Sequence, residues 1–164
     1  MNLIVAVDRN WAIGKDGDQF VYLSKDLQNF KNTTMGHAVI LGRKTLATFP
    51  GGRPLKGRRN LVLSRNPEFH PEGAEVYADV ERLLAAAPED AFVIGGGSVY
   101  EKLLPYCDRA YVTKLNGEWE ADTWFPNLDQ DPQWKLTEES EIMTEKEISF
   151  TFTVYERADG HVSR

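Results

Sequence analysis

The sequence predicts a single-domain α/β fold with a mainly parallel central sheet, an antiparallel C-terminal strand and about four flanking helices. Short apolar runs recur along the chain with helical or glycine-rich pieces between them, as in strands joined by crossovers. The early runs do not alternate apolar with polar residues, which is typical of a parallel sheet covered on both faces. The 164 residues are 41% hydrophobic and 27% charged, the mixture of one globular domain. We therefore expect one domain over 1–164, with 158–164 as a frayed tail.

The strands are predicted, in chain order, at 3–7, 38–41, 60–63, 75–77, 91–94, 110–113 and 149–156. The last strand, "SFTFTVYE", differs from the others because its side chains divide into two faces. These are Phe150, Phe152 and Val154 on one face and Thr151, Thr153 and Tyr155 on the other. Such alternation indicates an antiparallel strand near a sheet edge.

Helices are predicted at about 24–34, 43–48, 79–87 and 98–104. In the first of them Leu23, Leu27 and Phe30 form an apolar stripe, and Asp26 lies on that stripe. A carboxylate there gives up much of its hydration, which costs several kcal/mol unless a partner pairs with it. Asp26 could instead complement the helix dipole, with Ser24 as the cap, but that explains only an acid in the first turn.

Composition excludes several classes of protein. The single cysteine, Cys107, cannot form an internal disulfide, and His37, His70 and His161 stand far apart, so no metal site is expected. The first residues, "MNLIVAVDRNW", hold too few apolar positions for a signal peptide or a membrane span, which leaves the cytoplasm as the expected location. With a net charge of −6 and no long basic run, neither nucleic acid nor an acidic membrane is an expected partner.

Two glycine turns lie between a strand and a helix. In "FVIGGGSVYEKLL" the residues Gly95 to Gly97 precede a helix that opens at Ser98, and in "VILGRKT" Gly42 precedes another helix start. Such helix starts at the carboxyl ends of strands are where open α/β sheets bind dinucleotides. The alternative for one such turn alone is a tight connection without a ligand. The G-x-G-x-x-G fingerprint is absent, and the spacing of "GHAVILGRKT" does not fit a Walker A loop.

Basic residues accompany these turns. Arg43 and Lys44 open the second helix, and Arg65 lies just past the strand "NLVLS". No acid follows at the distance that would bind a ribose 2′-hydroxyl, so the pattern favours a 2′-phosphate and hence NADPH over NADH. The alternative for these three cations is a solvated surface.

Taken in order, several motifs resemble the dihydrofolate reductase family, of the bacterial chromosomal type, over nearly the whole length. Each motif alone is modest, and their common order makes the resemblance specific. They are Ala6, "WAIGKDG" (11–17) as a mobile loop, "LSKDLQNFKNTT" (23–34), "ILGRKT" (40–45), "GRPLKGRRN" (52–60), "VIGGGSVY" (93–100), "YVTKL" (111–115) and "ADTWFP" (121–126).

The resemblance implies NADPH-dependent reduction of 7,8-dihydrofolate to 5,6,7,8-tetrahydrofolate, with hydride transfer to C6 and protonation at N5. It places the chain in tetrahydrofolate biosynthesis and one-carbon metabolism, as an antifolate target. The expected partners are this small-molecule substrate and NADPH, and a monomer is expected.

The resemblance also implies that Asp26 and Thr113 are catalytic. Asp26 would face the pteridine and hydrogen-bond its N3 and 2-amino group, so that two donors meet two carboxylate oxygens. Thr113 would share the 2-amino group, directly or through water. Because Asp26 would touch the side of the ring far from N5, a water admitted by the loop at 14–22 is the expected proton donor.

The remaining site residues follow from the same resemblance. Phe30 would pack on the pterin and benzoyl rings, and Arg58 would hold the glutamate α-carboxylate. The implied substrate pocket is Ala6, Asp26, Leu27, Phe30, Phe49, Leu55, Arg58, Ile94, Tyr100 and Thr113. The implied cofactor site is Ala6, Ile13, Gly14, Gly42, Arg43, Lys44, Thr45, Ser64, Arg65, Gly95, Gly96, Gly97, Ser98, Val99, Tyr100 and Thr123.

The chain departs from the family pattern at two places. Many members carry Pro-Trp before the first helix, where this sequence has Phe20-Val21, and Tyr22 is expected to refill part of that space. Ser98 stands where bacterial relatives often carry Arg, which leaves more of the 2′-phosphate to the other cations. The alternatives are a riboflavin-pathway reductase of the same fold and a non-catalytic NADPH- or pterin-binding relative. Asp26 together with Phe30 and Arg58 favours a pterin with an acidic tail.

Overall fold

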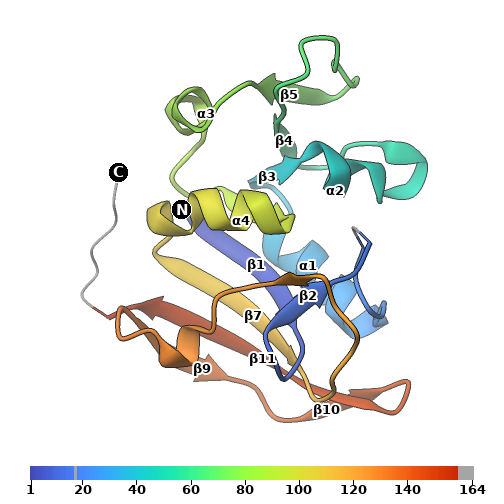
Figure 1. Cartoon of the computed structure of the whole chain (residues 1–164), viewed down its shortest axis with the longest axis vertical. Helices are drawn as coiled ribbons and strands as arrows, with labels where there is room; N and C mark the ends of the chain where they lie inside the picture. Colours follow the sequence, from blue (N-terminus) through green and yellow to red (C-terminus); the bar gives the residue numbers. More distant parts are fainter. Residues whose placement is uncertain (17, 159–164) are drawn as a thin grey trace.

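The central sheet organises the fold. Within residues 1–16 and 18–158, which the computed structural model describes, nine strands join in the order β10-β11-β7-β1-β6-β3-β4-β5, and β9 pairs with β11 beside that path (Figure 1). Their bounds are β1 Asn2–Val7, β3 Ala38–Gly42, β4 Arg59–Leu63, β5 Ala74–Tyr77, β6 Phe92–Gly95, β7 Arg109–Leu115, β9 Trp134–Glu139, β10 Met143–Glu145 and β11 Ile148–Arg157. The strands from β7 to β5 are parallel, and β11 runs antiparallel to β7. The predicted fold class is confirmed.

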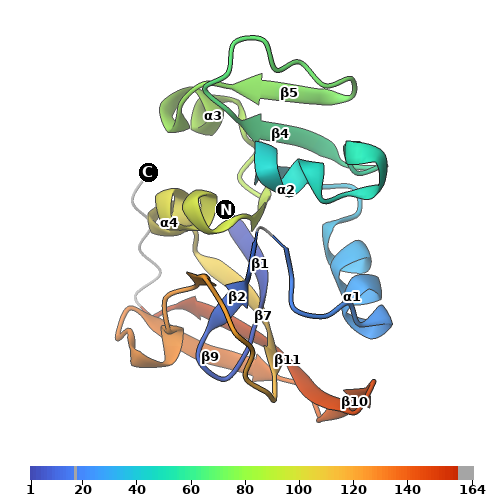
Figure 2. The same ribbon diagram turned by 45° about the vertical axis from the view of Figure 1, so that its right-hand side comes forward.

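Helices cover both faces of the sheet. α1 (Ser24–Thr34) and α2 (Arg43–Ala47) lie on one side, and α3 (Val80–Ala86) and α4 (Gly97–Leu103) on the other (Figure 2). Short 3₁₀ turns follow at η1 Pro50–Gly52, η2 Leu104–Tyr106 and η3 Leu128–Gln130. A separate two-stranded sheet pairs β2 (Ala12–Gly14) with β8 (Thr123–Trp124). The predicted helices are therefore present, with ends that differ by at most one residue.

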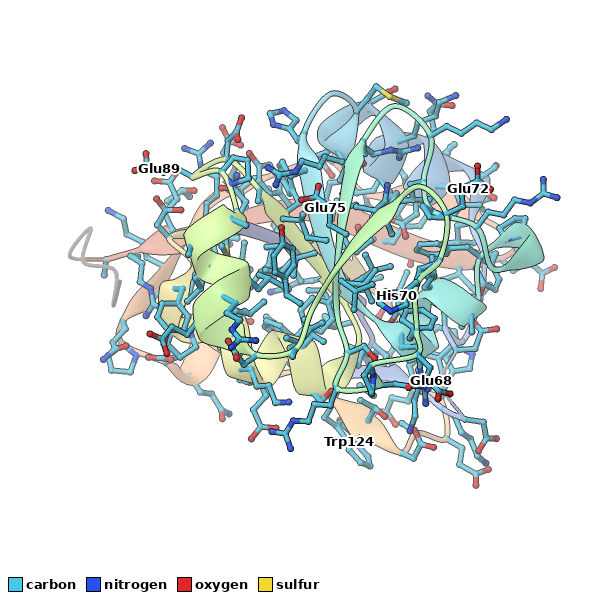
Figure 3. The ribbon with its side chains drawn as sticks, turned by 90° about the horizontal axis from the view of Figure 1, so that it is seen from above. Glu68, His70, Glu72, Glu75, Glu89 and Trp124 are labelled. Carbon is cyan, nitrogen blue, oxygen red and sulfur yellow. The ribbon has the colours of Figure 1, made fainter. Side chains whose placement is uncertain are left out.

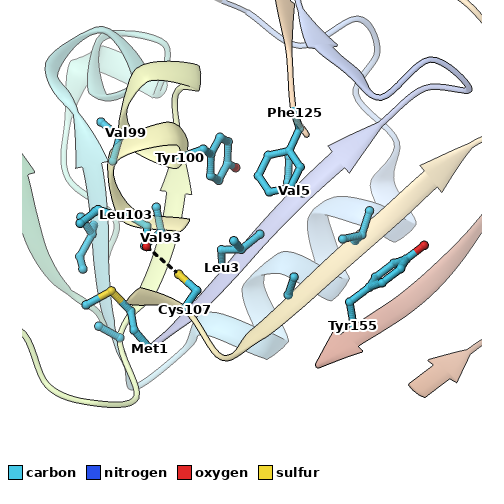
Figure 4. Close-up of a cluster of buried hydrophobic side chains, with 14 of the residues drawn as sticks. Met1, Leu3, Val5, Val93, Val99, Tyr100, Leu103, Cys107, Phe125 and Tyr155 are labelled. Atoms are coloured by element: carbon cyan, nitrogen blue, oxygen red, sulfur yellow. Dashed lines mark hydrogen bonds between the residues drawn. The ribbon is translucent and has the colours of Figure 1, made fainter. Parts of the chain in front are cut away.

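Two hydrophobic clusters fill the space between the sheet and its helices. Leu3, Val5 and Val7 of β1 point toward α4, where they join Val99 and Leu103, and Figure 4 shows this cluster around Tyr100. Ile4 points to the opposite face and joins the α1 and α2 side. This alternation along a strand with no polar residues is why the sequence reads as a continuous apolar run.

The C-terminal strand is more deeply buried than a solvated edge strand. Its two faces are as predicted, because Phe150 and Tyr155 belong to different clusters. However, Thr153 is as well buried as the aromatic residues, and its hydroxyl donates to the Val112 carbonyl at 2.6 Å. The reason is that β9 and β10 lie beyond β11, so that both edges of this strand are paired.

Four short strands, β2, β8, β9 and β10, do not appear in the sequence prediction. β9 is exposed after Trp134 and carries charged side chains, as edge strands often do, so it shows no apolar run. β2, β8 and β10 are only two or three residues long. Of the predicted tail, Ala158 is anchored by its N–H, which donates to the Gln133 carbonyl at 2.8 Å, and 159–164 lie outside the described residues.

Candidate active site

One cleft of about 2050 Å³ runs across the carboxyl ends of the parallel strands, between the two groups of helices. Every residue that the resemblance assigned to substrate or cofactor lines this cleft. The structure thus brings together segments from Ala6 to Thr123, although the individual roles stay predictions. Several further residues line it that the sequence analysis did not assign to the site, among them Asp18, Gln19, Lys31, Lys102 and Trp124.

Asp26 is held at one end of the cleft. Its Oδ1 accepts a hydrogen bond of 2.7 Å from the hydroxyl of Thr113, a residue of β7 that is only 3% exposed. Burial raises the pKa of Asp26 above its usual value; the bond from Thr113 opposes this shift, and the negative charge of Glu145 adds to it. A poorly hydrated carboxylate therefore lies beside the cleft with one neutral donor fixed to it.

The helix that carries Asp26 turns its apolar stripe toward the cleft. Leu27 is 46% exposed, although it lies on the stripe that the sequence assigned to a buried face, and Leu27 and Phe30 both line the cleft. The stripe thus forms a binding wall, which explains why an acid lies among its hydrophobic residues. Leu23 alone is buried against the sheet, at 2% exposure.

The proposed dipole cap of this helix differs from the sequence expectation. Leu23 is the N-cap residue and Ser24 is the first helical residue, and the Leu23 side chain makes no capping hydrogen bond. The Ser24 hydroxyl instead donates to Glu145 at 2.9 Å. The interpretation of Ser24 as the cap is wrong, because β10 supplies the acceptor.

Arg58 lies at the outer end of the same wall. Its Nε donates to the Lys56 carbonyl at 2.9 Å and its Nη1 to the Thr34 hydroxyl at 3.3 Å. These two bonds orient the guanidinium while it lines the cleft. A planar cation held in this way suits a carboxylate ligand.

The glycine turn lies in the middle of the cleft. Gly95 has a φ of +134°, a conformation that side chains rarely adopt, and a Cβ on Gly97 would lie 2.5 Å from Cγ2 of Thr123. The backbone of the turn is thus approached closely by its neighbours, which a side chain at Gly97 would prevent. Beyond it, the Tyr100 hydroxyl donates to the Ile4 carbonyl at 2.6 Å, and burial raises its pKa.

The other end of the cleft is cationic. Arg43, Lys44 and Arg65 are exposed and line it, together with the hydroxyls of Thr45, Ser64 and Ser98. The Arg43 guanidinium lies 6.0 Å from the ring centre of Phe69. Cations and hydroxyl donors beside an open glycine turn are the groups that bind phosphates, so this end fits a phosphorylated dinucleotide.

The loop between β2 and α1 borders the cleft, which is lined by Asp16, Asp18, Gln19 and Tyr22. Its Asp16 N–H donates to Asp122 Oδ2 at 2.9 Å, and the Asp122 N–H donates to the Gly14 carbonyl at 3.1 Å. β8 follows directly, where Trp124 is 56% exposed at the periphery of the molecule (Figure 3). Residue 17 of the predicted mobile loop lies outside the described residues.

The Phe20-Val21 dipeptide points away from the cleft. Phe20 stacks on Trp119 with ring centres 5.6 Å apart, and Val21 packs against Leu23 and its neighbours. Tyr22 lines the cleft instead, and its hydroxyl donates to the Asp18 carboxylate. Burial, together with that bond and the charge of Asp18, raises the pKa of Tyr22 to about 12. Tyr22 thus takes a place in the cleft wall, and its filling of the space of the absent Pro-Trp pair stays a prediction.

Together these features define an enzyme class: an open α/β sheet with a dinucleotide cleft that joins a cationic end to a half-buried carboxylate indicates a nucleotide-dependent oxidoreductase. The family model described as "Dihydrofolate reductase" matches residues 1–157. The chain belongs to the dihydrofolate reductase family, as its motifs predicted.

Individual relatives agree with this assignment. The chain is 40% identical to the dihydrofolate reductase of Bacillus subtilis, over 98% of this chain and 96% of that protein. It is also 40% identical to the enzyme of Staphylococcus haemolyticus, over 96% and 95%. Among solved structures, dihydrofolate reductase from Enterococcus faecalis complexed with NADP(H) and RAB-propyl has a TM-score of 0.85 at 34% identity, covering 96% of each chain.

Proposed function

We propose that this chain reduces 7,8-dihydrofolate to 5,6,7,8-tetrahydrofolate with NADPH as cofactor, using the cleft described above. The observation that carries the proposal is the Asp26–Thr113 pair, which lies in the same cleft as the glycine turn and the cationic end. NADPH supplies the hydride that C6 of the substrate receives, and the chain supplies alignment and proton control. Alignment alone can contribute roughly 7–11 kcal/mol.

Asp26 and Thr113 are the residues proposed to recognise the pterin. Asp26 presents a carboxylate at the apolar wall, and a ligand with two adjacent N–H donors would form charge-assisted bonds with it. The Thr113 hydroxyl donates to Oδ1 of Asp26, and this bond fixes the orientation of the carboxyl group. Leu27, Phe30 and Phe49 supply apolar contacts for the aromatic rings, and Arg58 pairs with the acidic tail.

Proton delivery is assigned to water rather than to Asp26 directly. Burial raises the pKa of Asp26, so the neutral form survives to a higher pH than in an exposed aspartate. As an acceptor of ring N–H groups it would fix the charge and tautomer of the pterin. The loop that carries Gln19 and Tyr22 borders the cleft, so we assign to it the control of water access.

The cofactor site is assigned to the glycine turn and the cationic end. Arg43, Lys44 and Arg65 would bind the 2′-phosphate, and Ser98 adds a hydroxyl where an arginine is common in relatives. The absence of side chains at Gly95 to Gly97 would let a ligand approach the backbone of the turn closely. Tyr100 and Ile94 would border the nicotinamide.

The deciding experiment follows NADPH absorbance after dihydrofolate is added. Oxidation of NADPH in step with tetrahydrofolate formation supports the proposal. Turnover only with a ribosylated pyrimidine would favour the riboflavin-pathway reductase, and NADPH binding without turnover would favour a non-catalytic relative. The findings on family membership do not favour either alternative.

We also propose a monomer located in the cytoplasm that does not bind nucleic acid. Across residues 1–16 and 18–158, no helix has the length and apolarity needed to cross a bilayer. Light scattering coupled to gel filtration tests the oligomeric state, and fractionation of cells tests the location.

A further inference from the structure

A carboxylate from a distant hairpin caps the helix that carries Asp26. Glu145 Oε2 accepts hydrogen bonds from the Ser24 N–H at 2.6 Å and the Ser24 hydroxyl at 2.9 Å, and Oε1 accepts from the Lys25 N–H at 3.0 Å. The first N–H groups of a helix have no partner within the helix, so this side chain, 121 residues further along the chain, satisfies two of them. Its negative charge also suits the positive end of the helix dipole.

The β10–β11 hairpin makes further contacts with the residues just before α1. The turn between β10 and β11 passes through Lys146 and Glu147, with φ values of 52° and 64°. Lys146 Nζ donates to the Tyr22 carbonyl at 2.7 Å, and Leu23 packs in one cluster with Met143 and Ile148. The hairpin therefore fixes the junction between the cleft loop and α1 through the polar side chains of Glu145 and Lys146 and through the apolar cluster around Leu23.

The same hairpin is also connected to Asp26 through β7, the strand that pairs with β11. β11 pairs with β7 so that Phe152 lies opposite Thr113, whose hydroxyl binds Asp26. Asp26 follows Lys25 directly in the first turn of α1. Its position thus depends on both strands of the β10–β11 hairpin.

Charged and titratable groups surround Asp26 from each neighbouring element. Glu145 acts from β10 and Tyr100 from α4, and the Thr113 hydroxyl binds from β7. Asp18 and Tyr22 of the loop and Lys31 on its own helix line the same cleft. Glu145 is the one acid in this set that is also bonded to the helix of Asp26, since Asp18 is bonded to Tyr22.

We propose that Glu145 is a positioning residue of the active site, whose carboxylate fixes the first turn of α1 and whose charge acts on Asp26 across that turn. This inference rests on the proposed role of Asp26. Replacing the charge while keeping an acceptor should favour the Asp26 anion, because a like charge is removed. Glu145 would then determine both the position of Asp26, the proposed catalytic acid, and the pH at which Asp26 loses its proton.

The test measures single-turnover hydride transfer against pH in the full-length protein. In Glu145→Gln the descending limb of the profile should move to lower pH, and the rate above neutrality should fall about twofold to fivefold, the range for charges that interact near solvent. The rate on the acidic plateau should stay unchanged. Glu147→Gln is the matched control, because it makes the same change in the same turn at a side chain directed to solvent, and its profile should follow that of the wild type.

The outcomes separate this inference from the proposed function. If Glu145→Gln lowers the rate at every pH without moving the profile, Glu145 is only a structural cap and the proposal fails. Equal shifts in the two variants would also overturn it, because any nearby charge would then suffice. In an Asp26→Asn background the shift from Glu145→Gln should vanish. If Asp26→Asn itself is as fast as the wild type, the role of Asp26 fails instead.

Discussion

The two ends of the cleft are built by different means. At the end proposed to bind the pterin, here called the pterin end, the polar side chains assigned to the ligand are already bonded to the protein, as with Asp26 to Thr113 and Arg58 to Thr34. At the cofactor end, Arg43, Lys44 and Arg65 are exposed, and within residues 1–16 and 18–158 none of them forms an ion pair. The pterin end is therefore preorganised, whereas the cofactor end attracts its ligand by charge. Single substitutions should have large, local effects at the first end and small, salt-dependent effects at the second.

The largest effect is expected at Asp26. Asp26→Asn keeps the volume and the acceptor for Thr113 but removes the charge, so hydride transfer at neutral pH should fall by roughly 10²–10⁴-fold. Acidifying the assay should rescue part of the rate, because the substrate then arrives protonated at N5. Single-turnover kinetics against pH measures both effects. A variant as fast as the wild type at pH 7 would leave Asp26 with no role beyond the helix dipole.

The same variant should be at least as stable as the wild type. Because burial raises the pKa of Asp26, the folded state binds its proton more tightly than the unfolded chain does. The charged carboxylate therefore destabilises the fold at pH values above its raised pKa, and this cost disappears as the pH falls below 3.8, the usual pKa of an aspartate. Urea unfolding of both proteins should show the difference at neutral pH and none at pH 3. If Asp26→Asn were less stable than the wild type at pH 7, the charged Asp26 carboxylate would not be destabilising the fold.

The next largest effect is expected at Arg58. Arg58→Leu should raise the dissociation constant for dihydrofolate about 10- to 100-fold, the loss of a charge-assisted bond, and should leave NADPH binding unchanged. Lys56→Leu is the matched control, because it removes a cation from the same segment outside the cleft. Calorimetry measures both ligands. Unchanged affinity for the substrate would make Arg58 an ordinary surface residue.

A moderate effect is expected at the cofactor end. The enzyme should prefer NADPH to NADH by at least about tenfold, or 1.4 kcal/mol, and the preference should narrow as salt is added. At low salt, Arg65→Gln should have a smaller preference for NADPH over NADH than the wild type has. Kinetics with both cofactors at two ionic strengths measures this. Equal use of both would remove the argument for a 2′-phosphate pocket, and a preference insensitive to salt would contradict the contrast between the two ends.

The smallest effect is expected at Tyr22. Tyr22→Phe removes the hydroxyl that binds Asp18 but keeps the ring in the cleft wall, so hydride transfer should change by less than about threefold. The free energy of unfolding should fall by roughly 0.5 kcal/mol, because Tyr22 is half exposed. Single-turnover and urea experiments test this. A hundredfold loss of rate would place Tyr22 in the proton path.

What the sequence predicted depended on how local each feature is. The glycine turn at Gly95 and the acid on the helix stripe at Asp26 are visible within a few residues, so their strand, turn and helix contexts could be predicted directly. The family followed from several such motifs in order. The exposure of Leu27 could not be predicted, because an apolar stripe looks the same whether it faces a core or a binding cleft.

The features that were missed join residues far apart in the sequence. Glu145 and Ser24 are 121 residues apart, and no local pattern marks an acid that caps another element's helix. β9 carries mainly polar side chains, so its place in the sheet depends on its pairing with β11 rather than on periodicity. The stacking of Phe20 on Trp119 likewise depends on how two loops meet.

Because Cys107 is buried, the reactivity of its thiol can be used to measure how often the surrounding core opens. The only sulfhydryl in the sequence has no exposed surface, and it donates to the Leu103 carbonyl at 3.4 Å, where α4 meets the strands (Figure 4). An alkylating reagent can reach it only when that part of the core opens, so the rate of labelling reports the population of the open state. Ligands that occupy the cleft bind the closed chain, and each should slow alkylation in proportion to its occupancy. The affinity of any compound for either end of the cleft could then be determined without following turnover.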